Sequence, residues 1–249
     1  LFDCDRNGIF YFELDMRQFL LLFFLFLSGE LVSQELNPSV FLGTVIEHHY
    51  YSISYVEEYE QPEWTYHIVC KNCYGQSERK NNFRADPLVK TTSAQLSDYK
   101  GSGYDRGHLV PAADMNRNET AMSESFYLSN MSPQHPSFNR GIWRKLETQI
   151  REWSMVYDTL YVVTGPILEF GYKTIGINEV AIPQFYFKAI YAENPGKMIG
   201  FVLPNEGSKE DILYYQVTVN EIEKRTKLDL FQALNDNLEQ RLESSLSKF

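Results

Sequence analysis

One short part of the chain collects side chains that together could hydrolyse a phosphodiester bond. Arg106 and His108 lie two residues apart, and Asn130, Asn139 and Glu147 complete a set between positions 106 and 147. The reaction needs a base that takes a proton from water, a cation that offsets charge on the phosphate oxygens, and a group that fixes the phosphate. A single histidine or arginine is more often structural than catalytic, so the prediction depends on the whole set.

Three members of the set have residue types suited to particular roles. His108 can be the general base, because an imidazole with a pKa of about 6.5 is neutral at physiological pH. The carboxamide oxygen of Asn139 is a hard ligand that suits Mg²⁺, an ion that keeps several water molecules. Glu147 lies about 12 Å further along an unbroken helix, so we expect it to act through water or as an orienting group rather than in the same inner coordination shell.

Hydrophobic and aromatic residues mark out the strands that must position this set. Five segments are rich in Tyr, Ile and Val and mostly bounded by Gly, Pro or Asn. They are residues 44–56, 64–69, 159–164, 180–192 and 197–203. The strands do not alternate regularly with helices, which argues against a doubly wound parallel sheet. We therefore predict an α+β protein with a largely antiparallel central sheet and flanking helices.

Spacing and capping signals predict three helices. From Asn139 onward, large apolar residues repeat at helical spacing and predict a helix with one buried stripe; they are Trp143, Leu146, Ile150 and Trp153. Thr218 and Glu221 have the spacing of a capping box, which opens a short helix through Lys224. Another amphipathic helix is expected over residues 238–246.

The first thirty-three residues are predicted to precede the folded domain. An apolar run of Leu and Phe at 19–27 follows Arg17 and is too short to span a membrane, which takes about 20 apolar residues. We therefore expect a non-native upstream stub at 1–15, a signal peptide at 16–33 and a single domain at 34–249. This interpretation predicts a secreted or periplasmic protein with no membrane association in its mature form.

The charge distribution favours an anionic substrate and argues against a protein that coats polyanions. The chain carries 23 basic and 33 acidic residues, a net charge of −10, unlike a histone-type packaging protein. In residues 76–151, however, eleven basic residues outnumber eight acidic ones and give a net charge of +3. These basic residues flank the set described above, which favours a negatively charged substrate.

Two cysteines allow a different class of activity. Cys70 and Cys73 form a C-x-x-C pair, which in an exported protein could carry out thiol–disulfide exchange. A redox motif of that kind opens a helix in a βαβ unit. Here the pair follows the strand-like run 64–69 and leads into Tyr74 and Gly75. A disulfide that closes a turn, or half of an incidental metal site, fits this context better.

The motifs of the basic region resemble those of the DNA/RNA non-specific endonucleases. This family has the ββα-metal fold and includes secreted bacterial sugar-non-specific nucleases and mitochondrial endonuclease G. The shared signature is Asp-Arg-Gly-His at 105–108, and the resemblance covers roughly residues 60 to 230. Its further segments are Tyr99 to Tyr104, Asn130 to Gln134, Leu146-Glu147, Thr164 to Pro166 and Val202 to Asn205.

The resemblance implies an activity and a role for each member of the set. His108 would be the general base, and Asn139 would be the one direct protein ligand of a hydrated Mg²⁺, for which Mn²⁺ could substitute. Arg106, Asn130 and Glu147 would be supporting site residues. The implied reaction is metal-dependent cleavage of DNA and RNA, with little sequence preference, to products with 5′-phosphate ends.

Members of the family also have an upstream arginine that stabilises the transition state. Arg79 and Arg84 could both match it. Arg84, in the segment 82–87, is the preferred choice, and we expect it to belong to the catalytic site.

Two other functions are compatible with the sequence. A thiol–disulfide protein using Cys70 and Cys73 would lose its function when the cysteines are replaced and would be insensitive to chelators. A non-catalytic nucleic-acid-binding module on the same fold is disfavoured, because it would not need Arg106, His108 and Asn139 together. The oligomeric state is not determined by the sequence, and a homodimer is compatible with it.

Overall fold

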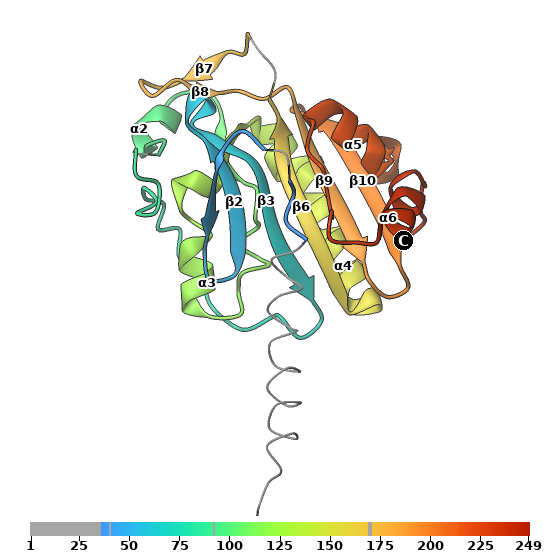
Figure 1. The fold of residues 1–249 in the computed structure, drawn as a ribbon. Coiled ribbons are helices and arrows are strands. Elements are labelled where there is room, and N and C mark those ends of the chain that lie inside the picture. The colour runs from blue at the N-terminus through green and yellow to red at the C-terminus, as the bar shows by residue number, and fades with distance from the viewer. Residues whose placement is uncertain (1–35, 40, 92, 169–170) are drawn as a thin grey trace, which may run out of the picture.

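A seven-stranded sheet forms the centre of the structure, a computed structural model that describes residues 36–249 apart from 40, 92 and 169–170. Its strands lie in the order β1-β2-β3-β6-β9-β10-β11, and each neighbouring pair is antiparallel. They are β1 (Thr44–Glu47), β2 (Tyr51–Val56), β3 (Gln61–Cys70), β6 (Thr159–Ile167), β9 (Phe185–Ala192), β10 (Lys197–Pro204) and β11 (Gln216–Val217). The predicted α+β fold with a largely antiparallel sheet is confirmed (Figure 1).

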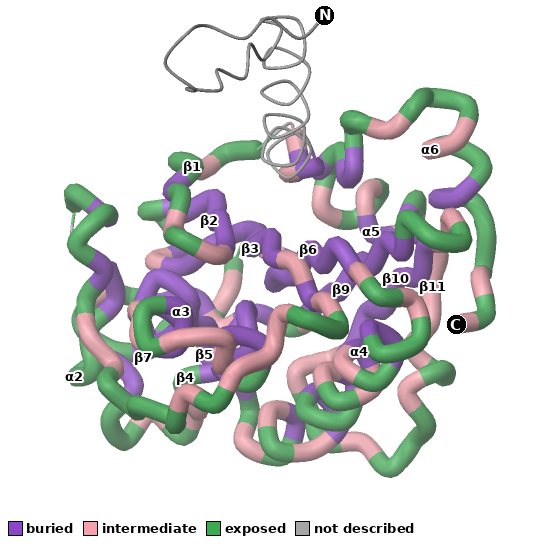
Figure 2. The backbone as a smooth tube through the Cα atoms, turned by 90° about the horizontal axis from the view of Figure 1, so that it is seen from below, coloured by how far each residue is buried: buried purple, intermediate pink, exposed green. Residues whose placement is uncertain are grey.

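Helices cover both faces of this sheet, because side chains alternate along each strand. Helix α4 (Arg144–Tyr157) packs on one face, and α5 (Val219–Thr226) and α6 (Asp236–Glu243) pack on the other (Figure 1). On β6, Val162 belongs to the core under α4, whereas Val163 belongs to the core under α5 and α6. The inner strands β2, β3, β6, β9 and β10 are accordingly the most buried layer of the molecule (Figure 2).

The predicted helices form close to their expected positions. All four residues of the apolar stripe are buried against the sheet, namely Trp143, Leu146, Ile150 and Trp153. Thr218 caps α5 by accepting a hydrogen bond from the Glu221 N–H at 3.2 Å. Helix α6 covers most of the predicted segment 238–246. The pattern did not predict two short helices, α2 (Leu96–Tyr99) and α3 (Glu119–Glu124), because so few residues show little periodicity.

A second, two-stranded sheet and the helix that follows it form the ββα motif implied by the family resemblance. Strand β4 (Asp105–His108) pairs antiparallel with β5 (Met131–Gln134). A π-helical turn, η3 (Phe138–Trp143), then leads into α4. The 3₁₀ turn η2 (Leu128–Asn130) lies immediately before β5.

The remaining elements are short and lie around the central sheet. They are the hairpin of β7 (Thr174–Ile175) and β8 (Val180–Ala181) and the 3₁₀ turns η1 (Glu57–Tyr59) and η4 (Ile212–Tyr215). The predicted stub at 1–15 and signal peptide at 16–33 lie outside the described residues. Within the residues that the structure describes, no helix combines the length and apolar character needed to cross a membrane.

Candidate active site

A cavity of about 290 Å³ opens between strand β4, the chain that follows it and the start of α4. Four of the predicted site residues line it, namely Arg106, His108, Asn139 and Glu147. The other lining residues are Arg79, Pro111, Ala112, Ala113, Arg140, Arg144 and Arg151. The cavity thus brings an imidazole, a carboxamide and a carboxylate together with five guanidinium groups, a composition suited to a negatively charged substrate.

Strand β4 presents Arg106 and His108 on the same side, because they are two residues apart. Gly107 lies between them, where a Cβ atom would collide with the side chain of Gln134. Gln134 is fully buried on the paired strand, so a larger residue at 107 would push the two strands apart. The glycine of the motif is therefore needed for the hairpin that presents the imidazole.

The ring of His108 is held against two aromatic rings. Phe83 and Phe126 contact it edge to face, with centroid distances of 5.7 and 4.9 Å. Its Nε2 atom is enclosed and has no hydrogen-bond partner among the described residues, so Nδ1 is the nitrogen that can meet a water molecule in the cavity. Burial, together with the charges of Arg79 and Arg106, lowers the pKa of His108 to about 3. The imidazole is therefore neutral at physiological pH and can accept a proton.

A carboxylate orients the Asn139 side chain. The amide nitrogen of Asn139 donates to Asp105 Oδ2 at 2.9 Å, which leaves the amide oxygen as the group that can bind a cation. Asp105 is itself held by Arg140, whose Nε and Nη2 donate to its two oxygens at 2.8 and 2.6 Å. Burial alone would raise the pKa of Asp105, but the hydrogen bonds from Arg140 and Asn139 bring it below its usual value. The carboxylate that orients Asn139 is therefore ionised.

The expected separation of about 12 Å between Asn139 and Glu147 assumed an unbroken helix, and this assumption is wrong. Gly141 has φ −106° and ψ −112°, outside the helical region, and the regular helix starts only at Arg144. The chain therefore bends between the two residues. Both side chains line the same cavity.

Glu147 is surrounded by charges from several elements. Burial raises the pKa of its carboxyl, and the positive charge of Lys188 on β9 is the largest opposing influence. Asp114 raises the pKa further, whereas Arg151 and Arg79 lower it. The net effect is a pKa above the ordinary value of a glutamate, so this group takes up a proton at a higher pH than an exposed carboxylate does.

Asn130 does not line the cavity and instead binds the backbone behind it. Its side chain is fully buried. Its Oδ1 accepts from the Val110 N–H at 2.9 Å, and its Nδ2 donates to the carbonyl oxygens of Val110 at 3.0 Å and Ser125 at 2.9 Å. The Leu109 N–H also donates to the Asn130 carbonyl at 3.1 Å. These bonds fix the chain immediately after His108, so the geometry gives Asn130 a positioning role.

The Asn130→Ala variant is expected to lose stability as well as activity. The substitution leaves buried backbone groups of Val110 and Ser125 without partners, and each such group costs about 1–3 kcal/mol. We expect the free energy of unfolding to fall by about 2–5 kcal/mol, measured by urea denaturation, and kcat to fall with it. A variant with unchanged stability and no activity would contradict this account.

The structure places Arg79, and not Arg84, at the cavity. The guanidinium of Arg79 lies over the ring of Phe126 at 4.9 Å from its centroid, beside the imidazole. That of Arg84 lies over Tyr127 at 4.1 Å and donates to the carbonyl oxygen of Ser123 at 2.9 Å. The preference for Arg84 is therefore corrected, because its guanidinium is bound to Ser123 in the last turn of α3 and does not line the cavity.

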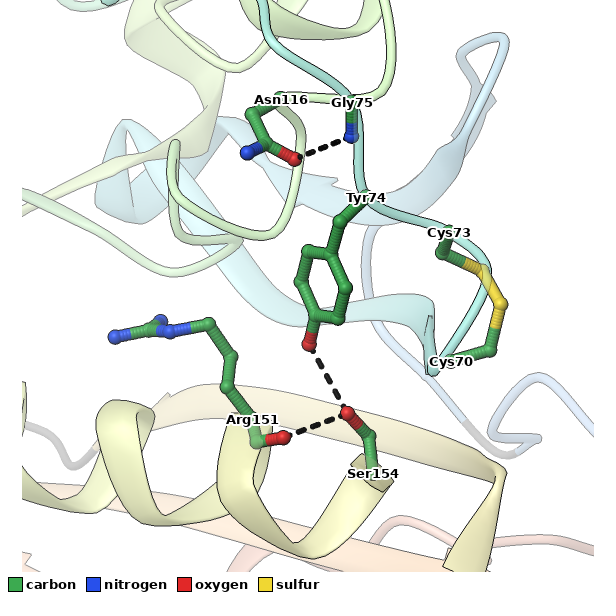
Figure 3. Close-up of a disulfide and its surroundings, with 7 residues drawn as sticks. All are labelled: Cys70, Cys73, Tyr74, Gly75, Asn116, Arg151 and Ser154. Atoms are coloured by element: carbon green, nitrogen blue, oxygen red, sulfur yellow. Dashed lines mark hydrogen bonds between the residues drawn. A yellow bond between two sulfur atoms is a disulfide. The ribbon is translucent and has the colours of Figure 1, made fainter.

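The loop that carries Arg79 is anchored at its start by three contacts, which Figure 3 shows. They are the disulfide between Cys70 and Cys73, the hydrogen bond from the Tyr74 hydroxyl to Ser154 Oγ at 3.0 Å, and the hydrogen bond from the Gly75 N–H to Asn116 Oδ1 at 3.1 Å. Ser154 belongs to α4, so the second contact joins the loop to the helix that carries Glu147. The cysteine pair thus closes a turn at the end of β3, as its sequence context indicates.

Replacing both cysteines tests this structural role against a thiol–disulfide function. The Cys70→Ser/Cys73→Ser variant is expected to be less stable by up to about 2 kcal/mol, because the cross-link closes only a very short loop. We expect plasmid cleavage by the variant to stay close to that of wild type, since Tyr74 and Gly75 still hold the loop. Thermal unfolding and plasmid cleavage measure the two effects. Complete loss of activity in a folded variant would favour the thiol–disulfide function.

The sequence did not identify four residues that shape the site. Asp105 belongs to the Asp-Arg-Gly-His motif, but its role depends on hydrogen bonds to Asn139 and Arg140, which lie 34 and 35 positions away. Phe83 and Phe126, which hold the imidazole, have no distinctive pattern. Lys188 could have been noticed from the sequence, because a lysine in the middle of an aromatic and aliphatic strand is unusual.

The donor groups in the cavity fit a hydrated magnesium ion. Mg²⁺ prefers oxygen ligands, keeps several waters and is bound through few protein groups. The amide oxygen of Asn139 is a suitable direct donor, and the carboxylate of Glu147 could accept hydrogen bonds from metal-bound water. In the part of the chain that the structure describes, no group of three or more His, Cys, Asp or Glu side chains could hold an ion. The mode that fits is therefore one direct side-chain ligand completed by water.

The ββα motif and this cavity define a class of metal-assisted nucleases, and comparison with known proteins identifies the family. A family model described as DNA/RNA non-specific endonuclease matches residues 31–237, and the chain belongs to this family. Mitochondrial nuclease EXOG of Danio rerio is 35% identical over 202 residues, which cover 73% of this chain and 59% of the relative. Nuclease C1 of Cunninghamella echinulata var. echinulata is 33% identical over 210 residues, which cover 76% of this chain and 83% of the relative.

A solved structure supports the same family at the level of the fold. The crystal structure of the EndoG/EndoGI complex, described as showing the mechanism of EndoG inhibition, contains a chain that is 30% identical to this one. The two chains superpose with a TM-score of 0.75, over 83% of this chain and 92% of the other. By contrast, the chain spans only 56–59% of the length of the EXOG proteins that it matches.

The prediction of a secreted or periplasmic protein is wrong. Relatives from Danio rerio, Mus musculus, Schizosaccharomyces pombe and Saccharomyces cerevisiae are named as mitochondrial nucleases. The prediction depended on the apolar run at 19–27. Such a run shows affinity for an apolar environment, but it does not specify which compartment a protein is sent to.

Proposed function

We propose that the chain is a metal-dependent endonuclease that hydrolyses phosphodiester bonds of DNA and RNA with little sequence preference. The observation that carries the proposal is the shared cavity of His108, Asn139, Glu147 and Arg79. Family membership supports an endonuclease activity. The metal requirement, the substrates and the products are part of the proposal, and the domain that carries them is residues 34–249.

His108 begins the reaction by accepting a proton at Nδ1 from a water molecule. The water oxygen then forms a bond to phosphorus as the bond from phosphorus to the 3′-oxygen breaks. The leaving 3′-oxygen takes up a proton from solvent water, so the product carries a 5′-phosphate and a 3′-hydroxyl. Arg79 and Arg106 lie beside the imidazole and offset charge on the phosphate oxygens. A Mg²⁺ or Mn²⁺ ion held by Asn139 would neutralise charge on the phosphate and on the leaving oxygen.

The lining of the cavity also supports the lack of sequence preference. Its cations are guanidinium groups, which bind the phosphate backbone. Contacts to phosphate position a nucleic acid without reading its bases. Both DNA and RNA present that backbone, so both are proposed as substrates.

Incubation with supercoiled plasmid and with single-stranded RNA, each with Mg²⁺ and with excess EDTA, tests the proposal. We expect both substrates to be cut with Mg²⁺ and neither with EDTA, and the DNA ends to be ligated without prior phosphorylation. Unchanged cleavage in EDTA would contradict the metal requirement. Absence of cleavage of both substrates under every metal condition would contradict the proposed endonuclease activity.

The Asn139→Ala variant tests the metal-binding role. We expect its kcat to fall by more than the ~10- to 100-fold that is typical of residues that only orient a metal ligand. The matched control is Asn220→Ala, because Asn220 is exposed in α5 on the opposite face of the sheet and its loss should leave cleavage unchanged. Equal activity of the two variants would remove Asn139 from the site.

A further inference from the structure

Lys188 is a cation enclosed within the protein core. It lies in the middle of β9, and only 1% of its surface is exposed. Lysine is almost never fully buried unless it is paired, because removing an ammonium group from water is costly. In the part of the chain that is described, however, Lys188 forms no direct ion pair. A residue held in this way needs an explanation other than packing.

The ammonium group of Lys188 contacts residues in the segments that form the active-site cavity. Its Nζ donates to Thr164 Oγ1 at 2.8 Å and to the carbonyl oxygen of Leu109 at 3.5 Å. It also lies 4.6 Å from the ring centroid of Trp143, close enough for a cation–π interaction. Leu109 directly follows His108, and Trp143 ends the π-helical turn that carries Asn139. Lys188 therefore contacts the segments that present both groups.

We propose that Lys188 is a positioning residue of this active site, which fixes the backbone after His108 and supplies from the core the positive charge that Glu147 faces. The inference rests on the proposed function. Lys188 does not touch the substrate in this account and acts through its neighbours.

Among the charged groups around Glu147, Lys188 is the main positive charge that favours its ionised form. Arg151 also faces Glu147, but its Nη1 is committed to Asp114 Oδ1 at 2.9 Å. Arg79 is exposed, so solvent screens its charge. Asp114 is itself negative and opposes ionisation of Glu147. The remaining positive charge is that of Lys188, which acts from within the core.

Removal of this charge should move the pH dependence of cleavage in a known direction. Burial raises the pKa of Glu147 and Lys188 lowers it, so loss of Lys188 raises that pKa further. Glu147 then binds a proton at a higher pH. As the pH falls, the form of the enzyme with an ionised Glu147 carboxylate therefore disappears at a higher pH than in wild type. An opposite charge near a carboxyl changes its pKa by about 1–3 units, so the acid limb of kcat/KM should move upward by about one pH unit.

The test compares the Lys188→Met and Thr164→Val variants with wild type, at saturating Mg²⁺, from about pH 5 to 9. Lys188→Met keeps the length of the side chain and removes its charge. Thr164→Val removes the hydrogen bond to the same ammonium group and keeps the charge. We expect the acid limb to move upward only in Lys188→Met, with kcat/KM at pH 6 falling about tenfold relative to its plateau, while thermal unfolding shows that both variants are folded.

Two further variants keep the proposal falsifiable. Lys188→Gln, which is also neutral but retains a donor for Thr164, should show the same shift if Lys188→Met does not fold. In a Glu147→Gln background the charge of Lys188 has no carboxylate to act on, so Lys188→Met should produce no further shift. An unmoved acid limb in a folded neutral variant overturns the inference. The proposed function fails separately, through absence of metal-dependent cleavage by the wild-type chain.

Discussion

Replacement of His108 by alanine is expected to lower kcat by about 10²–10⁴-fold, the usual contribution of a general base. The variant loses the imidazole that faces the cavity, while Asn139, Glu147 and Arg79 keep the contacts that place them there. Activity should be measured as initial rates of plasmid and RNA cleavage at saturating Mg²⁺. A folded variant with near-normal turnover would exclude His108 as the base.

The matched control for this variant is His49→Ala. His49 is an exposed histidine in the turn between β1 and β2, with 70% of its side chain accessible. Because it lies outside the lining of the cavity, its loss should leave kcat unchanged. The contacts of His108 with Phe83 and Phe126 are lost in His108→Ala, so thermal unfolding must accompany the kinetics to separate lost chemistry from lost stability.

The pH profile of kcat/KM reports groups of the free enzyme, and we expect its acid limb to report Glu147 instead of the imidazole. Burial and the neighbouring arginines lower the pKa of His108 to about 3, so the free imidazole is protonated only well below neutral pH. The raised pKa of Glu147 lies closer to neutrality. Activity should therefore fall in mild acid through loss of the Glu147 carboxylate, and a profile that is flat between about pH 5 and 9 would contradict this assignment.

The parts of the fold that could be predicted are those with a local signal. The stripe of Trp143, Leu146, Ile150 and Trp153 marks one face of α4 through its spacing alone. The hydroxyl of Thr218 and the backbone of Glu221 lie close enough in sequence to mark the start of α5. His108, Asn139 and Glu147 could be named because a compact motif places their chemistry in one segment.

The parts that could not be predicted depend on where separate segments meet. Gly141 interrupts the helix pattern at one residue, and this bend decides that Asn139 and Glu147 share a cavity. Arg79 and Arg84 are equivalent as sequence, and only the path of the loop separates them. That path is set by contacts to Ser154 and Asn116 from distant elements, which leave no pattern within the loop itself.

The second large effect on the cleavage rate is expected from replacement of Arg79, the arginine that lines the cavity. Arg79→Ala is expected to lower kcat by about 10²–10³-fold, as for loss of one group that stabilises charge in the transition state. The guanidinium lies over Phe126, on the ring that also contacts His108, and it is exposed to the cavity where a phosphate would bind. Single-turnover cleavage of a short DNA duplex measures this step without interference from product release.

Arg84→Ala is the control, because Arg84 has the same charge and lies only five positions away. Its guanidinium is occupied by Tyr127 and by the carbonyl oxygen of Ser123, so its loss should lower the unfolding temperature and leave the single-turnover rate close to that of wild type. The opposite outcome, in which Arg84→Ala is inactive and Arg79→Ala is active, would mean that the loop takes another path when nucleic acid is bound. Equal losses of the cleavage rate in both variants would indicate that cleavage depends on the total positive charge of the region. The position of either guanidinium group would then not matter.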